Sequence, residues 1–198
     1  MISDRVRAAY ESVRAEVGPR VTVVAATKYV PFEDMALLVE AGIGVVGENR
    51  AQDLQRKHAA YGPSFRWHFI GHLQSNKAVT VGELCELVHS VDSDSSARRL
   101  HVPMLLEVNL TGEPSKSGVA PAEVAGYVDR YPAICGLMTM PPLSADPAAS
   151  RPWFRQLRQL AEETGLEQLS MGTSQDWRVA VDEGATHIRL GSTLFGER

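Results

Sequence analysis

The stretch Val21-Thr22-Val23-Val24-Ala25-Ala26-Thr27-Lys28 decides how the rest of the chain is interpreted. It is a β-branched, apolar run that ends in an amine shortly before Pro31, which predicts a buried strand with Lys28 at its C-terminal end. A lysine is seldom buried without a partner, and loss of solvent favours the neutral amine, the form that attacks an aldehyde to give a Schiff base. A lysine in a salt bridge or in solvent is the simpler alternative.

Outward from this stretch, strand-like apolar runs alternate with helix-like segments. The alternation predicts an amphipathic N-terminal helix over residues 2–17, followed by eight strands separated by helices. The strands are expected at residues 21–28, 45–49, 65–71, 87–92, 104–110, 134–140, 168–171 and 186–190, and the helices at 32–41, 51–61, 77–85, 95–100, 121–130, 153–163 and 177–183.

Strands that are buried on both faces and joined by crossover helices form parallel sheets. Eight such units most simply close into a (β/α)8 TIM-type barrel, here with an extra N-terminal helix. Residues 1–198 show no composition shift or linker, so one domain is expected. An open doubly wound sheet is the alternative, but no GxGxxG motif follows the first strand to support its dinucleotide-binding version.

The composition is that of an ordinary globular protein, with 44% apolar and 22% charged residues and a net charge of -4. This charge gives no electrostatic reason to expect nucleic acid or an anionic membrane as a partner. No apolar run reaches membrane-spanning length and no signal peptide is evident, so a cytoplasmic location is expected. Cys85 and Cys135 are expected to be small buried thiols. His68 and His72 are four residues apart, but on a strand and its following turn they cannot share one face as they would on a helix, so no metal site is expected.

Small hydroxyl-bearing residues follow the last two predicted strands. Gly172-Thr173-Ser174 comes after residues 168–171, and Gly191-Ser192-Thr193 comes after residues 186–190. In barrels of this type phosphate commonly binds the loops after strands seven and eight, through backbone N–H groups and hydroxyls. Turn formation and helix capping explain either loop alone, but both loops at the two expected positions favour phosphate.

Arg189 lies on the last predicted strand, two residues before Gly191. Strand alternation therefore points its side chain to the same side as His187 and Gly191, toward the barrel mouth. A guanidinium there could bond a phosphate or an aromatic ring nitrogen. A structural ion pair with Glu107 or Glu48 is the alternative.

A phosphate site and a candidate Schiff-base lysine in one barrel mouth suggest pyridoxal 5'-phosphate (PLP), which supplies both a phosphate and an aldehyde. Eight groups of short motifs, which cover nearly the whole chain in order, also carry a resemblance. They are residues 26–28, 47–49, 67–71 with 73–77, 89–92, 108–109 with 115–118, 136–138, 169–172 with Ser174, and 189–192 with 195–196. In these motifs the chain resembles the YggS/PROSC family of PLP-binding proteins, the PLP homeostasis proteins, which are related in fold to the barrel domain of alanine racemase.

The resemblance implies a single barrel of PLP fold type III without the C-terminal β-domain, in which Lys28 holds PLP as a Schiff base. It places Asn49 near the cofactor. It also implies that the phosphate is bound by Ser174, Gly191 and Ser192. Where the family usually has threonine after the last-strand glycine, this chain has Ser192, which keeps the hydroxyl.

The segment Arg189-Leu190-Gly191 also resembles the Arg-x-Gly segment of alanine racemases, whose arginine meets the pyridine nitrogen, so Arg189 is assigned to that nitrogen, N1. His68, Met138 and Met171 either line the pocket or pack in the core. The connection over residues 92–103 is shorter than the family usually has, so its helix is expected to span only a turn or two.

Two functions from different classes follow from the resemblance. The first is a PLP-binding protein that buffers the cofactor or delivers it to PLP-dependent apoenzymes, without turnover of its own, as a monomer. The second is a PLP-dependent amino-acid racemase, which needs an acid or base on each face of the substrate carbon. The chain stops at Arg198 without the β-domain that supplies the second group in alanine racemases. Its tyrosines also lie away from the strand ends, except for Tyr29. Both observations favour the carrier. A plain interaction domain is the third option.

Overall fold

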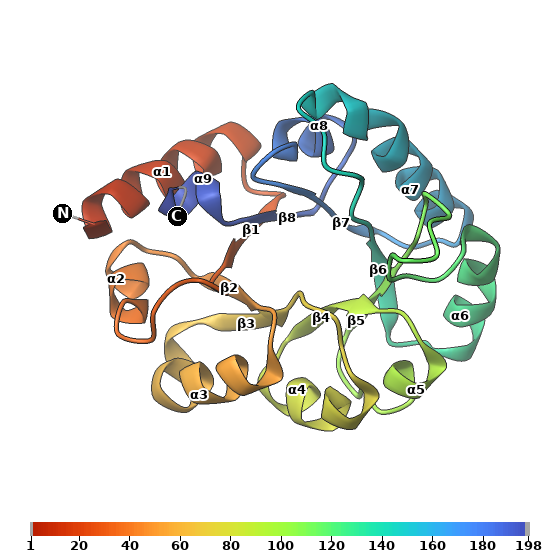
Figure 1. Cartoon of the computed structure of the whole chain (residues 1–198), viewed down its shortest axis with the longest axis horizontal. Helices are drawn as coiled ribbons and strands as arrows, with labels where there is room; N and C mark the ends of the chain where they lie inside the picture. The colour runs from red at the N-terminus through yellow and green to blue at the C-terminus, as the bar shows by residue number, and fades with distance from the viewer. Residues whose placement is uncertain (1, 197–198) are drawn as a thin grey trace.

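Eight parallel strands close into a barrel in the computed structural model, which describes residues 2–196. Each strand pairs with the next along the chain, and the last pairs with the first. Figure 1 shows the ring of strands with the helices outside it. The predicted (β/α)8 barrel is therefore confirmed. Its strands are β1 (Thr22–Ala26), β2 (Val45–Glu48), β3 (Arg66–Phe69), β4 (Leu87–Val91), β5 (Met104–Glu107), β6 (Ile134–Met138), β7 (Gln168–Thr173) and β8 (His187–Leu190).

The connecting helices lie close to their predicted positions, and one short helix was not predicted. Its residues, Ser192–Phe195, were expected to form only a loop. The segment between β4 and β5 contains a single four-residue helix, as its shortness predicted. The α-helices are α1 (Ile2–Val17), α2 (Met35–Glu40), α3 (Ala51–Tyr61), α4 (Ala78–Leu84), α5 (Asp94–Ala97), α6 (Val124–Arg130), α7 (Arg151–Glu163), α8 (Trp177–Asp182) and α9 (Ser192–Phe195), with short 3-10 turns η1 (Gly62–Ser64), η2 (Ser75–Lys77), η3 (Pro121–Glu123) and η4 (Pro147–Ser150).

The N-terminal helix α1 packs beside α9, so the two ends of the described chain lie side by side in Figure 1. The apolar positions Val6, Val13 and Val17 of α1 are buried, which explains why a helix with a charged outer face adheres to the barrel. A hydrogen bond from the Arg5 guanidinium to the Phe195 carbonyl, 2.8 Å long, joins the two helices.

The inside of the barrel is more polar than the layers of branched apolar residues that usually fill this fold. Four polar side chains lie at its centre: His68, His89 and Ser170 are buried, and His187 is half-buried. Alternation along each strand turns these positions inward, while the intervening residues face the helices. Of the residues expected either to line the pocket or to pack, His68, Met138 and Met171 are all buried and none lines the large cavity described below, so packing accounts for them.

Gly71 lies where two backbone segments approach closely. A Cβ added there would lie 2.1 Å from the Asn49 carbonyl oxygen, and a backbone atom cannot move aside as a flexible side chain can. We expect Gly71→Ala to lower the free energy of unfolding by about 2 to 3 kcal/mol. Urea denaturation would measure the loss. Gly44→Ala is the matched control, because a Cβ at Gly44 meets nothing within 4 Å, and equal stability losses in the two variants would contradict the prediction.

Both cysteines of the described chain are free, as the sequence predicted. Cys85 is buried and Cys135 is half-buried. Across residues 2–196 no helix combines the length and apolar character needed to cross a membrane.

Candidate functional site

A cavity of about 1000 Å³ opens at the carboxyl ends of the strands. Its wall includes the turn after β1, the residue after β2, the loop after β7, and β8 with the start of α9. The structure brings all of the sequence-predicted site residues together in this wall: Lys28, Asn49, Ser174, Arg189, Gly191 and Ser192.

Lys28 reaches the cavity from an exposed position, so the prediction of a buried amine was wrong. Strand β1 ends at Ala26, and a turn closed by a hydrogen bond from Val30 N to the Thr27 carbonyl (2.9 Å) lifts Lys28 above the barrel end. Its amine lies 4.7 Å from the centre of the Tyr29 ring, which also lines the cavity. The amine is therefore accessible to an incoming aldehyde from the cavity.

The buried lysine of this region is Lys57 of α3, which the sequence did not single out. Its amine lies 2.5 Å from Oε1 of Glu48, a residue with no exposed surface, and donates to the Thr27 carbonyl at 2.8 Å. The Thr27 hydroxyl donates to the same carboxylate oxygen at 2.6 Å. This network lies outside the barrel and anchors the residue that precedes Lys28. Because Glu48 faces α3, the alternative of a Glu48–Arg189 ion pair was wrong.

The two hydroxyl-rich loops meet at Ser174. Its Oγ accepts hydrogen bonds from the backbone N–H groups of Gly191 and Thr193, each 3.1 Å long. These two bonds occupy both N–H groups and leave the hydroxyl hydrogen of Ser174 free to donate, with Ser192 in the same cavity wall, a pattern that suits an anion. Gly172 makes the loop possible, because its φ is +90° and a Cβ there would lie 2.6 Å from the Ala180 methyl group.

Arg189 lies at the inner end of the cavity, and its side chain is 5% exposed. One terminal nitrogen donates to Ser170 Oγ at 2.5 Å, and the other donates to the Thr139 carbonyl at 3.2 Å. Burial lowers the pKa of the guanidinium to about 10, so it stays charged at neutral pH. Glu107 and Arg189 form no direct ion pair among the described residues, but the charge of Glu107 raises the pKa of Arg189, so the two groups interact at longer range.

A second cavity of about 240 Å³ adjoins the first at Met140 and is lined by Glu107, Asn109 and Lys116 among others. Burial, and next the charge of Asp92, raise the pKa of Glu107 to about 7. In the sequence analysis Glu107 appears only as a possible ion-pair partner of Arg189. Its place two residues after the inward-facing Leu105 was the signal that it points into the barrel.

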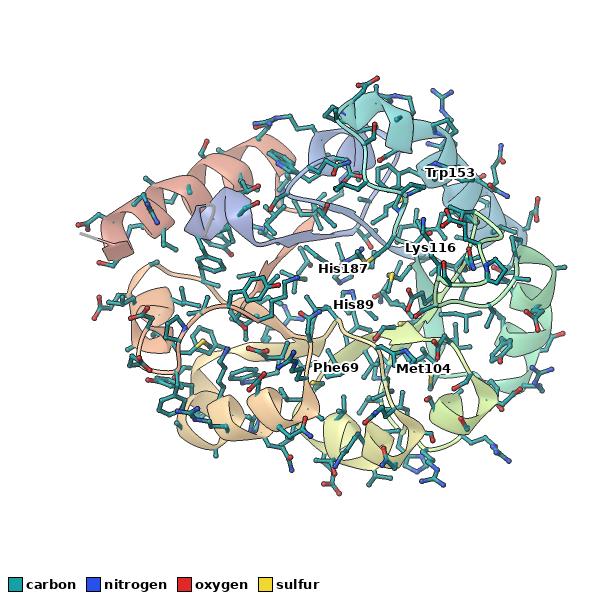
Figure 2. The ribbon with its side chains drawn as sticks, viewed as in Figure 1. Phe69, His89, Met104, Lys116, Trp153 and His187 are labelled. Atoms are coloured by element: carbon teal, nitrogen blue, oxygen red, sulfur yellow. The ribbon has the colours of Figure 1, made fainter. Side chains whose placement is uncertain are left out.

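Three histidines meet at the barrel centre, where Figure 2 labels His89 and His187. The ring of His68 lies 5.0 Å from that of His89 and 5.9 Å from that of His187, between centroids. Burial is the main cause that lowers the pKa of His68 to about 3 and that of His187 to about 4, and it lowers the pKa of His89 well below its ordinary value. All three rings are therefore neutral at pH 7.

These histidines predict a loss of stability in mild acid. Between pH 6.5 and about pH 4 the unfolded chain binds protons that the folded chain does not, so the free energy of unfolding falls as the pH falls. Each histidine contributes a slope of up to about 1.4 kcal/mol per pH unit. Urea denaturation at several pH values should show a flatter slope for His187→Gln than for the wild type. An unchanged slope would contradict the assignment, and exposed His101→Gln is the control.

Comparison with known proteins places this geometry in a family. The chain is 39% identical over 197 residues to the pyridoxal phosphate homeostasis protein of Aquifex aeolicus, with 89% of this chain and 86% of the relative covered. It is 34% identical to PipY of Synechococcus elongatus, solved with PLP bound, with a TM-score of 0.87 over 96% of this chain and all of that one. No family model matches the sequence.

More distant solved structures share the barrel. The arginine decarboxylase of Paramecium bursaria Chlorella virus is 13% identical, with a TM-score of 0.73 over 97% of this chain and 63% of that one, which shows the fold alone. The match covers 86% of the Aquifex relative and all of the PipY chain. The chain therefore belongs to the family of pyridoxal phosphate homeostasis proteins.

Proposed function

We propose that the large cavity binds PLP and that the protein buffers or delivers this cofactor. The observation that carries the proposal is the convergence of all six predicted residues on one cavity, with the Lys28 amine in one part and the joined hydroxyl-rich loops in another. PLP supplies an aldehyde that can form a Schiff base with an amine, and a ring that can withdraw electrons. The PLP-bound structure of PipY supports the proposal.

The residues present fit the functional groups of PLP. Ser174, Gly191 and Ser192 would hold the phosphate, and Lys28 would form the covalent link. Asn49 lines the cavity with a buried Oδ1 that has no hydrogen-bond partner among the described residues, so its amide can serve a polar group of the ligand.

Arg189 would bond the pyridine nitrogen. A guanidinium is only a donor, so it stabilises the unprotonated nitrogen and weakens the ring as an electron sink. Because alanine racemases also have an arginine at this nitrogen, the contact supports PLP binding and does not separate a carrier from a racemase. The buried, twice-bonded guanidinium supports this role because it is fixed before a ligand arrives.

A racemase is the second candidate. Racemisation needs proton-transferring groups on both faces of the substrate carbon. Of the side-chain types that commonly act as general acid or base, the described part of the cavity wall contains Lys28 and Tyr29, which are adjacent in one turn, with the amine 4.7 Å from the centre of the ring. We therefore favour a carrier. If the purified protein interconverted alanine enantiomers faster than free PLP does, the racemase would be the better description.

We propose that the chain acts as one barrel domain over residues 1–198, as a monomer, and that PLP-dependent apoenzymes receive its cofactor. The homeostasis function in the name of the Aquifex relative supports the last point. The cytoplasmic location expected from the sequence stays a prediction.

Titration with PLP, followed by borohydride reduction and peptide mapping, tests the proposal. We expect an absorbance band typical of a Schiff base to saturate at one PLP per chain, and the reduced label to lie on the peptide that contains Lys28. A label on Lys57, Lys77 or Lys116 would refute the site assignment. The absence of any saturable band would leave only the plain interaction domain.

A further inference from the structure

Arg189 is the first member of a hydrogen-bonded row of side chains that runs into the barrel interior. The guanidinium donates to Ser170 Oγ at 2.5 Å, Ser170 Oγ lies 2.7 Å from His89 Nδ1, and His89 Nε2 lies 2.9 Å from His68 Nδ1. The four residues come from β8, β7, β4 and β3, and none is more than 5% exposed. No solvent competes for these hydrogen bonds.

The chemistry of the four groups favours one direction of donation along the row, because the opposite direction would leave the Ser170 hydroxyl hydrogen without an acceptor in the row. A guanidinium has no acceptor, so Ser170 must accept from Arg189 and its single hydroxyl hydrogen is free to go to His89 Nδ1. His89 then carries its own hydrogen on Nε2 and donates it to His68 Nδ1, which leaves the hydrogen of His68 on Nε2. Both imidazoles are thus neutral and each is held in one tautomer.

A proton added to His89 would disrupt this order. His89 would then donate from Nδ1, and Ser170 would have to accept from both His89 and Arg189 while its own hydrogen lost its acceptor. Burial lowers the pKa of both His89 and His68, in agreement with neutral rings. In this arrangement Ser170 and His89 each accept one hydrogen bond and donate one, which fixes both groups in the row.

We propose that Ser170 and His89 are positioning residues that hold the Arg189 guanidinium in the orientation that meets the pyridine nitrogen of bound PLP. The proposal rests on the proposed function, which places that nitrogen at Arg189. Among the described residues the guanidinium has one other acceptor, the Thr139 carbonyl at 3.2 Å, so without Ser170 a long side chain with many rotamers keeps a single hydrogen bond. The carbonyl and Ser170 together fix the plane of the guanidinium.

Paired substitutions at His89 test the proposal. His89→Gln keeps an acceptor for Ser170 and a donor for His68, whereas His89→Leu removes both with little change in volume. We expect His89→Leu and Ser170→Ala to bind PLP about tenfold more weakly, and His89→Gln to bind within about twofold of the wild type. His187→Leu is the control, because it removes a half-buried imidazole from the same cluster whose hydrogen bond goes to Thr186 and not to the row.

The position of the ring nitrogen gives a readout that loss of packing alone would not change. With PLP labelled with nitrogen-15 in its ring, we expect His89→Leu and Ser170→Ala to move the ring-nitrogen resonance, and His187→Leu and His89→Gln to leave it in place. If the wild type bound no PLP, the proposed function would fail. If the wild type bound PLP and both His89→Leu and Ser170→Ala matched it in affinity and resonance, the positioning role would be overturned.

The histidine tautomers can be measured even if a variant does not fold. In wild-type protein labelled with nitrogen-15 in its histidines, we expect His89 and His68 to carry hydrogen on Nε2 alone at pH 7, with or without PLP. A cationic ring, or hydrogen on Nδ1 of His89, would contradict the direction of the row. This measurement does not depend on PLP binding.

Discussion

Lys28→Ala is expected to abolish the Schiff-base absorbance band and to prevent borohydride from fixing PLP to the protein. The reason is that Lys28 is the only lysine in the wall of the large cavity among the described residues. The phosphate loops and Arg189 are unchanged in this variant, so non-covalent binding should remain, weakened by more than about tenfold. Absorbance titration measures the band, and mass spectrometry after reduction measures covalent attachment.

Lys77→Ala is the matched control, since Lys77 lies outside that wall, in η2. It should bind and retain PLP as the wild type does. Because Lys28 is exposed, its replacement should leave the free energy of unfolding nearly unchanged, and urea denaturation can confirm this. If Lys28→Ala retained as much covalent PLP as the wild type after reduction, the Schiff base would have to form at another lysine.

Lys57→Met is expected to lower the free energy of unfolding by about 3 to 5 kcal/mol. The substitution leaves the Glu48 carboxylate buried without its ion-pair partner, 2.5 Å from the Lys57 amine in the wild type, and a lone buried charge is costly. The Thr27 carbonyl also loses its donor. Urea denaturation measures the stability. PLP affinity should fall as well, because the turn that carries Lys28 loses its anchor.

A second variant separates the lost charge pair from lost packing. Adding Glu48→Gln to Lys57→Met removes the unpaired charge and keeps an acceptor for the Thr27 hydroxyl, so the double variant should recover more than half of the stability. A loss below about 1 kcal/mol in Lys57→Met alone would mean that the pair is solvated in the folded protein.

Local sequence patterns accounted for most of the fold. The alternation of apolar runs and amphipathic segments predicted eight strands, and all eight form within or close to the expected ranges. The residues after the last two strands predicted a shared anion site, and Ser174 does join their loops. The helix α9 was missed because its four residues, Ser192–Phe195, carry too few periodic positions to show a pattern.

Side-chain environments could not be predicted in the same way. Lys28 was expected to be buried because its stretch is apolar, but β1 ends two residues earlier and the turn exposes it. Lys57 lies in the helix predicted over residues 51–61 and no sequence pattern distinguished it, yet it is the lysine that is buried. Both outcomes depend on where a strand stops and which helix packs over it.

The sequence by itself determined the order of the barrel elements and which residues stand at the strand ends, because periodicity and turn chemistry are local properties of the chain. Only the tertiary structure decided which side chains contact one another. Closing the barrel brings β8 next to β1, so Arg189 and Lys28 line one cavity although 160 residues separate them in sequence, and it aligns Ser170 with His89 across the interior. Those contacts follow from ring closure and strand register, which no single stretch of sequence contains.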